Sequence, residues 1–270
     1  MRDTNKAIVH GCQNTSYLFE QFNVIESFLS DFSFLILGRD NIVCKNYAFS
    51  LQQILNSSQA TLGNIIECCK CFCLADAYTL LRKYRDDLFF CLYLVTYDAY
   101  AKLGESKTIK KMEINIEQWC QDNLSNLNIN EVLATIGTSK WLQEAVCKYD
   151  LQKSFGRIGR QLNNYVHGNG FSFYNINAYS FDEKNIEEQL NAIISTVRYI
   201  TTAFLFLLSL CSPHYIMSTD YFDHLEFSQT PPDGSQYWVA PFVAEYLKAN
   251  IEMIDKSCYE YLKENTCMAL

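Results

Sequence analysis

The sequence predicts an all-α fold, a helical bundle with additional helices at its N- and C-terminal ends. Only four prolines and ten glycines occur in 270 residues, so we expect long uninterrupted elements. Hydrophobic residues make up 49% of the chain, which is enough for a sizeable core. These residues recur every three or four positions, the period of a helix with one buried face. No internal repeat and no linker is recognisable, and we therefore expect a single domain over residues 1–270.

The first 111 residues contain three helical patterns and a loop. The spacing of apolar residues predicts a helix over residues 17–37, which Gly38 ends, and a second helix over residues 42–55. Residues 62–103 contain no proline and are either one very long helix or two helices with a tight joint. Residues 104–111 are rich in charged side chains and are expected to form a connecting loop.

Shorter elements surround a central helix of residues 153–170. We expect helices over residues 113–124 and 130–136, and another that begins near Trp141. After the central helix, residues 171–181 are expected to form a loop, and residues 183–211 a helix that Pro213 stops. Residues 214–241 are the least regular part, and a final amphipathic helix is expected over residues 243–261. Residues 212–270 thus form a C-terminal loop and helix.

The central helix has two different faces. Its apolar residues step by three and four positions and form one stripe, namely Leu151, Phe155, Ile158, Leu162 and Tyr165. At about 100° per residue, five polar residues fall on roughly the opposite side, namely Lys153, Arg157, Arg160, Asn164 and His167. Gly168 can adopt a positive φ and end the helix. A helix that buries its apolar stripe can therefore present arginine, asparagine and histidine together.

The polar face carries the residue types that RNA cleavage without a metal requires. Histidine titrates near neutral pH, so His167 can move the proton of a 2′-hydroxyl group. Arg160 offers planar donors that match phosphate oxygens, and Asn164 can orient the imidazole or the phosphate. Arg157 and Lys153 extend this face as expected substrate-binding residues. The plain alternative is that all these side chains only face solvent.

Arg85 stands within an otherwise apolar stripe of the segment 62–103. An arginine there must be paired or must face a cavity, because burying an unpaired guanidinium is costly. One interpretation is a structural ion-pair cluster of Arg82, Arg85 and Asp86. The other is that Arg85 points to a polar pocket and contributes to substrate binding.

Charge and composition limit the compartment and the partners. The net charge of −8 argues against a broad basic surface for nucleic acid, but leaves room for a small basic site. The N-terminus lacks the apolar region of a secretory signal, so the twelve cysteines are expected to be reduced thiols in a cytoplasmic protein. The apolar run of residues 199–211 is shorter than the roughly 18–20 residues of a membrane span. This favours a buried helix over a membrane-dipping segment.

Two groups of residues suggest a metal site, and neither has a recognised ligand spacing. Four cysteines lie within residues 68–73, but structural zinc sites usually draw two pairs from separate segments. We interpret these cysteines as buried, inert thiols. His214 and His224 flank acidic residues in the irregular C-terminal segment, again without a known pattern. We expect no metal and no cofactor.

The run from Arg160 to His167 resembles the signature of the HEPN superfamily (higher eukaryotes and prokaryotes nucleotide-binding domains). That signature is an arginine, four to six intervening residues and a histidine, on a late helix of an α-helical bundle. The resemblance covers about residues 62–211 and implies a metal-independent endoribonuclease, with Arg160 and His167 as the catalytic pair and Asn164 as an auxiliary residue. It departs at Gln161, where active members commonly carry asparagine, aspartate or histidine. This departure weakens the case for catalysis more than the case for the fold.

The resemblance also implies partners. Many members act in toxin–antitoxin, abortive-infection and other phage-defence systems, and they usually form homodimers in which two motifs make one site. We therefore expect RNA as substrate, a homodimer, an antitoxin or other partner protein, and no membrane. The alternative is a non-catalytic helical module that uses the same fold to dimerise or to hold a partner.

Overall fold

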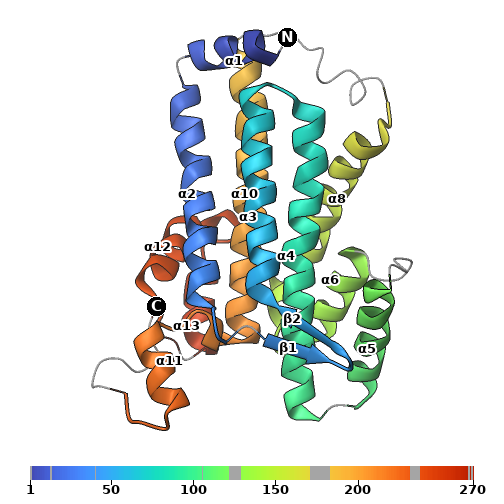
Figure 1. Cartoon of the computed structure of the whole chain (residues 1–270), viewed down its shortest axis with the longest axis vertical. Coiled ribbons are helices and arrows are strands. Elements are labelled where there is room, and N and C mark those ends of the chain that lie inside the picture. The colour runs from blue at the N-terminus through green and yellow to red at the C-terminus, as the bar shows by residue number, and fades with distance from the viewer. Residues whose placement is uncertain are drawn as a thin grey trace.

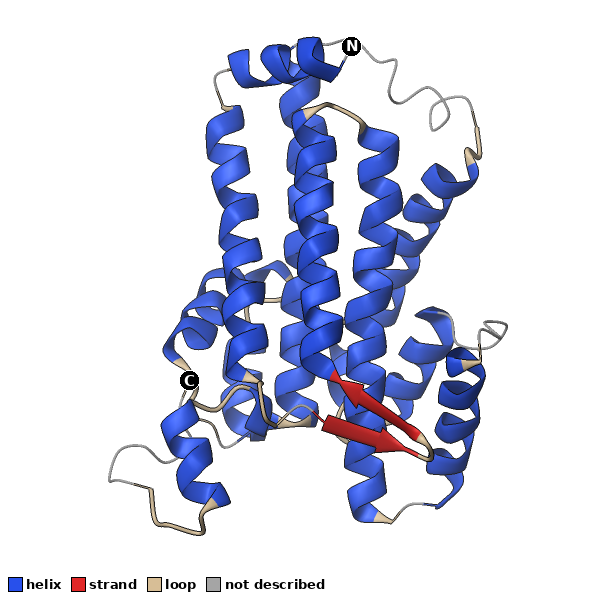
Figure 2. Cartoon of the chain, in the orientation of Figure 1, coloured by secondary structure: helices blue, strands red, loops and turns tan. Residues whose placement is uncertain are grey.

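The computed structural model describes residues 2–12, 14–39, 41–104, 106–121, 129–170, 183–231, 238–266, 268 and 270. Within these residues nearly all regular structure is helical, and one two-stranded antiparallel sheet is present (Figure 2). The prediction of an all-α fold is confirmed. The expected loop of residues 171–181 lies outside the described residues.

Long helices packed side by side form the centre of the structure (Figure 1). They are α2 (Thr15–Leu35), α3 (Leu51–Lys70), α4 (Leu74–Leu103), α8 (Leu151–His167) and α10 (Glu183–Cys211). Helix α4 contacts α3, α8 and α10, and α2 contacts α3 and α10. Because other helices surround α4 and α10, both carry buried apolar residues on more than one side. Arg85 is a buried charged residue on α4.

Helix α10 is the only described helix that is long and apolar enough to cross a membrane, but most of its apolar stretch is buried inside the bundle. Leu205, Phe206 and Leu207 are fully buried by neighbouring protein. This is the position of a core helix, and it confirms that the run of residues 199–211 is a buried helix.

Shorter helices cover the ends and sides of this bundle (Figure 1). On the side of α4 lie α5 (Ser106–Cys120), α6 (Ile129–Thr138) and α7 (Gln143–Lys148). Helix α1 (Arg2–Gly11) crosses the end of the bundle at which α3 joins α4. The C-terminal elements are η2 (Pro213–Tyr215), α11 (Thr219–Glu226), α12 (Pro241–Asn250), η3 (Ile251–Met253) and α13 (Cys258–Thr266).

The helix predicted for residues 42–55 is wrong over its first half. These residues form a hairpin of β1 (Asn41–Cys44) and β2 (Tyr47–Ser50), joined by a two-residue turn in which Lys45 has φ 52°. Ile42 and Cys44 are buried while Asn41 and Val43 are exposed, so the burial has the period of a strand. The Ser50 hydroxyl then accepts a hydrogen bond from the Gln53 amide at 3.3 Å and caps α3.

One further segment agrees with the prediction and two do not. The segment 62–103 is two helices with a joint at residues 71–73, one of the two expected arrangements. The loop predicted at residues 104–111 is wrong, because α5 begins directly after the turn at Gly104. The single helix predicted at residues 243–261 is wrong as well: the Asp255 carboxylate accepts the Ser257 amide at 2.8 Å, and this local turn starts α13 as a separate helix.

Candidate functional site

Helix α8 ends at the predicted terminator Gly168, and it begins at Leu151, two residues before the predicted start. Asp150, with φ 49°, separates it from α7, and Gly168, with φ 57°, terminates it. The Gly168 amide donates to the Tyr165 carbonyl at 3.4 Å, and the Asn169 amide donates to the Asn164 carbonyl at 3.0 Å. These two bonds define a Schellman motif, which fixes the last turn of the helix and therefore the position of His167.

The apolar side of α8 is packed firmly against the bundle. Leu151, Phe155 and Leu162 are buried, and Ile158 and Tyr165 are half-buried. The Phe155 ring meets the Phe89 ring of α4 edge to face at 4.5 Å, and Tyr165 stacks on Tyr78 with centroids 3.9 Å apart and planes inclined by 3°. Stacked and edge-to-face aromatic pairs add stability beyond their buried area, so both halves of α8 are fixed on α4.

Gly159 belongs to this packed side and allows a close approach to Arg85. A Cβ atom at Gly159 would lie 3.2 Å from Arg85 Nη1. The Arg85 side chain is only 1% exposed, and its Nε and Nη2 donate to Asp86 Oδ1 at 2.9 and 2.7 Å. Among the described residues its Nη1 has no hydrogen-bond partner. Arg82 Nε lies 3.8 Å from Asp86 Oδ2, so the three residues form the ion-pair cluster of the first interpretation.

Arg85 therefore lies under α8 and away from its polar face. The structure does not bring it together with Arg160, Asn164 and His167, and a molecule bound to the exposed face cannot touch a side chain that is 1% exposed. The role of Gly159 was missed in the sequence. It was recognisable there, because Gly159 is spaced four residues from Phe155 and three from Leu162, within the apolar stripe.

The opposite side of α8 is exposed and basic. Lys153, Arg157, Arg160 and His167 are exposed, and Asn164 is partly exposed. Lys153 Nζ lies 3.3 Å from an Asp150 carboxylate oxygen, and Arg157 Nη2 donates to Ser154 Oγ at 3.3 Å. Within the described part of the chain, the side chains of Arg160, Asn164 and His167 make no hydrogen bond or ion pair. All three can therefore turn their donors toward a ligand.

The charge of α8 is opposite to that of the whole chain. The helix carries a lysine and two arginines and no aspartate or glutamate, whereas the chain has a net charge of −8. A positive face of this size attracts anionic groups, and no carboxylate on the same helix neutralises its charge. The helix is thus the small basic site for which the composition left room.

A shallow depression of about 240 Å³ adjoins this face. It is lined by Ser154, Arg157, Ile158, Gln161 and Tyr199. Burial raises the pKa of Tyr199 above its ordinary value, so this phenol is neutral and remains a hydrogen-bond donor at neutral pH. The depression therefore offers a cation and neutral polar groups beside the exposed face.

The spacing along α8 sets the size of the site. Arg160 and His167 are seven residues apart, which is about 10.5 Å along the helix axis at nearly the same azimuth. Asn164 lies between them, one turn from each. One copy of α8 thus offers one imidazole, one guanidinium and one amide in a row.

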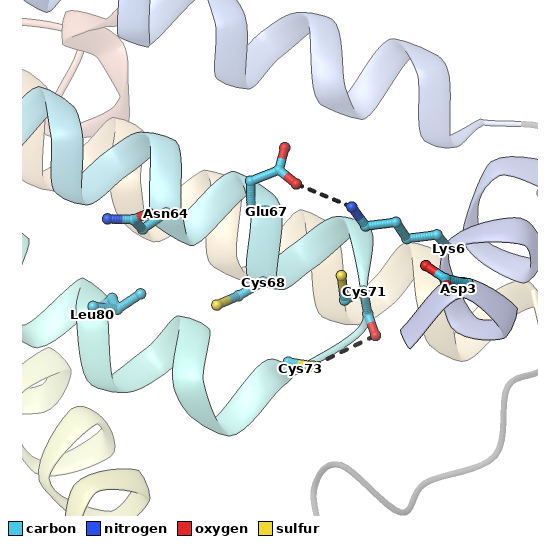
Figure 3. A pocket seen from close by; sticks show the side chains of 8 residues that line it. All are labelled: Asp3, Lys6, Asn64, Glu67, Cys68, Cys71, Cys73 and Leu80. Carbon is cyan, nitrogen blue, oxygen red and sulfur yellow. Dashed lines mark hydrogen bonds and ion pairs between the residues drawn. The ribbon is translucent and has the colours of Figure 1, made fainter. Parts of the chain in front are cut away.

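The remaining candidates of the sequence lie elsewhere. The cysteines of residues 68–73 lie in the last turn of α3 and in its joint with α4. Cys69 and Cys71 are buried, but Cys68 and Cys73 (Figure 3) are half-buried, so the expectation of buried thiols is wrong for these two. Burial lowers the pKa of His214 to about 4, so this imidazole is neutral at pH 7. In the described ranges, no group of three or more histidine, cysteine, aspartate or glutamate side chains is arranged to hold a metal ion.

No protein-family model, no curated protein and no solved structure matches this chain.

Proposed function

We propose that the protein is a metal-independent endoribonuclease of the HEPN type whose active site is the exposed face of α8. Arg160 and His167 are the catalytic pair, and Asn164 is an auxiliary group. The observation that carries this proposal is that these three side chains stand unpaired, within the described residues, on a helix that is fixed to α4 by aromatic packing. Rigid support of exposed catalytic groups reduces the ordering required when substrate binds.

The chemistry follows from the three groups. Neutral His167 accepts the proton of a ribose 2′-hydroxyl, and the 2′-oxygen attacks the adjacent phosphorus. Arg160 donates to the non-bridging oxygens and stabilises the additional negative charge of the phosphorane. Expulsion of the 5′-oxygen leaves one fragment with a 2′,3′-cyclic phosphate and the other with a 5′-hydroxyl once that oxygen has received a proton.

The need for that proton supports a homodimer. The attacking and leaving oxygens lie on opposite sides of the phosphorus, so one imidazole cannot serve both. Helix α8 carries no carboxylate that could act as the acid. The group that protonates the leaving oxygen must therefore come from outside this helix. In a homodimer, the His167 of the second copy supplies the acid, and the two α8 faces together enclose the phosphate.

Lys153 and Arg157 are the substrate-binding residues of this proposal. Both lie on the exposed face toward the start of α8, and Arg157 also borders the depression that Gln161 and Tyr199 line. They attract neighbouring phosphates of the RNA strand, which predicts binding that weakens as the salt concentration rises. A toxin or phage-defence effector of the cytoplasm is the setting we infer, with an antitoxin or partner protein that covers α8.

A non-catalytic interaction module is the second candidate. Gln161 favours it, because this neutral side chain stands directly after Arg160 and faces the depression. Under this candidate the exposed face of α8 binds a partner protein without cleaving RNA. Cleavage of RNA by the purified protein distinguishes the two candidates.

The test is cleavage of single-stranded RNA by purified protein in the presence of a chelator. Wild type is expected to cleave. His167→Ala is expected to lose at least about 100-fold in rate, the contribution of a positioned acid–base group. Arg160→Ala is also expected to lose at least about 100-fold, the contribution of a donor to the transition-state charge. His10→Ala is the matched control, because His10 is likewise an exposed histidine in the last turn of a helix. Equal rates for wild type and both α8 variants contradict the nuclease, and absence of cleavage by a folded dimer favours the interaction module.

A further inference from the structure

The turn between α3 and α4 places two cysteines at paired positions of one backbone motif. Phe72 has φ 53°, its amide donates to the Cys69 carbonyl at 2.9 Å, and the Cys73 amide donates to the Cys68 carbonyl at 2.8 Å. These bonds are those of a Schellman motif in which Cys68 and Cys73 occupy the two positions whose side chains commonly touch. In most proteins these two positions carry apolar side chains, and here both carry thiols. The Cys73 thiol donates to the Cys71 carbonyl at 3.8 Å.

The backbone of this turn is held in place by its neighbours. The left-handed conformation normally favours glycine, and a phenylalanine adopts it at an energetic cost. The Phe72 ring is fully buried, and burial of a side chain this size offsets that cost. Asn5 of α1 also donates from Nδ2 to the Cys71 carbonyl at 3.1 Å. The relative position of Cys68 and Cys73 is therefore a fixed property of the fold.

The two thiols are also accessible. A pocket of about 420 Å³ opens beside the turn and is lined by Cys68, Cys71 and Cys73 together with Lys6 and Glu67 (Figure 3). Cys68 and Cys73 are half-buried, whereas Cys69 is fully buried and burial raises the pKa of its thiol far above the ordinary value. Cys68 and Cys73 therefore border the pocket, and Cys69 does not.

We propose that Cys68 and Cys73 form a reversible intramolecular disulfide by exchange with a small-molecule disulfide. In the first step the thiolate of Cys73 attacks one sulfur of the small disulfide, forms a mixed disulfide and expels one small thiolate. In the second step the thiolate of Cys68 attacks the Cys73 sulfur and expels the other small thiolate. The two protons lost by the cysteines pass to the two leaving thiolates, and the two electrons lost by the protein reduce the small disulfide to two thiols.

The geometry of the turn assigns the two roles. Cys73 is the residue that precedes the 30-residue helix α4, where the unsatisfied amide groups of the first turn favour a negative charge. Cys68 lies in the last turn of α3, next to the carbonyl end of that helix, so it acts second. A disulfide requires Cα atoms about 4.4–6.8 Å apart. A Cys68 carbonyl oxygen 2.8 Å from the Cys73 amide nitrogen holds the two backbones near that range.

Closure of the disulfide would also affect α8. Tyr78, five residues after Cys73, stacks on Tyr165, two residues before His167. A covalent link between the end of α3 and the start of α4 stiffens the support of the Tyr165 ring. The thiol exchange itself does not depend on the proposed nuclease function, because it is measured by mass without RNA.

The experiment exposes reduced full-length protein to oxidised glutathione, alkylates the remaining thiols and maps the peptides by mass spectrometry. A Cys68–Cys73 cross-link without bound glutathione is expected, and dithiothreitol should reverse it. Cys147 serves as an internal control, because it is exposed on α7 and should carry glutathione as a mixed disulfide. Cys68→Ser is expected to accumulate glutathione on Cys73, and Cys73→Ser to react more slowly at Cys68.

Three results would overturn the proposal. The first is that Cys68 and Cys73 both remain alkylatable under conditions that fully modify Cys147. The second is that each carries its own glutathione, and the third is that Cys71 replaces one of them in the cross-link. Because the wild-type protein gives the decisive reading, a folding defect of a serine variant does not obscure the outcome.

Discussion

Asp86→Asn is expected to destabilise the protein by about 3 kcal/mol, although Asp86 is on the surface. Its carboxylate accepts two hydrogen bonds from Arg85, whose side chain is 1% exposed, and no other anion contacts that guanidinium in the described residues. Removing one partner of a buried ion pair costs about 3–5 kcal/mol, because the remaining charge stays desolvated. We take the lower end of that range because Asp86 is 41% exposed, so water partly screens the pair.

Urea unfolding followed by circular dichroism measures this effect. Arg85→Met removes the desolvated charge and keeps most of the side-chain volume, so it should lie within about 1 kcal/mol of wild type. The double variant should recover most of the stability that Asp86→Asn loses, since no buried charge remains. Arg82→Met is the control, because Arg82 also pairs with Asp86 but its side chain is 35% exposed and 3.8 Å away. This variant should cost less than about 1 kcal/mol.

The reasoning is refuted if Asp86→Asn unfolds at the urea concentration of wild type. It is equally refuted if Arg85→Met loses as much stability as Asp86→Asn and the double variant recovers nothing. Either result would mean that Asp86 is not the group that compensates the burial of Arg85.

Three further predictions concern other parts of the structure. Burial lowers the pKa of His214 to about 4, so between pH 6.5 and pH 4 the unfolded chain binds a proton at this residue and the folded chain does not. Over that range the free energy of unfolding of wild type should fall by about 3 kcal/mol more than that of His214→Gln, as measured by urea unfolding. A raised or equal loss in the variant contradicts this. Gly168→Ala should lower the unfolding free energy by about 1–2 kcal/mol, because Gly168 has φ 57°, and a neutral result in thermal unfolding would show that the turn relaxes. If two copies of His167 share one site, a large excess of His167→Ala protein should lower cleavage per wild-type subunit after subunit exchange, whereas unchanged cleavage would place the whole site in one copy.

The sequence predicted the long helices well and the short irregular segments poorly. Helices α8 and α10 were recognised because each has an apolar period over many residues and a terminator, Gly168 or Pro213. The hairpin of residues 41–50 was missed because Lys45, not glycine, adopts the positive φ of its turn. The sequence left open whether residues 62–103 form one helix or two for a similar reason. At the joint between α3 and α4 the left-handed conformation is taken by Phe72 and not by a glycine.

The candidate site was predicted from one helix, and what lies beneath that helix was not. Helical spacing is sufficient to gather Arg160, Asn164 and His167 on one exposed face, because their neighbours are set by the same backbone. The contact of Gly159 with Arg85 and the stack of Tyr165 on Tyr78 join segments about 75–90 residues apart. Spacing within one helix contains no information on such contacts, which depend on the packing of α8 against α4.

The central claim is that the face of α8 cleaves RNA through the 2′-hydroxyl without a metal, and the ends of the products test it most directly. One oligonucleotide sequence, made as RNA and as DNA, is incubated with the protein in chelator, and the fragments are analysed by mass spectrometry. The account predicts RNA fragments with 2′,3′-cyclic phosphate and 5′-hydroxyl ends, and DNA that stays intact. Cleavage of the DNA, RNA fragments with 5′-phosphate ends, or RNA that stays intact would contradict it.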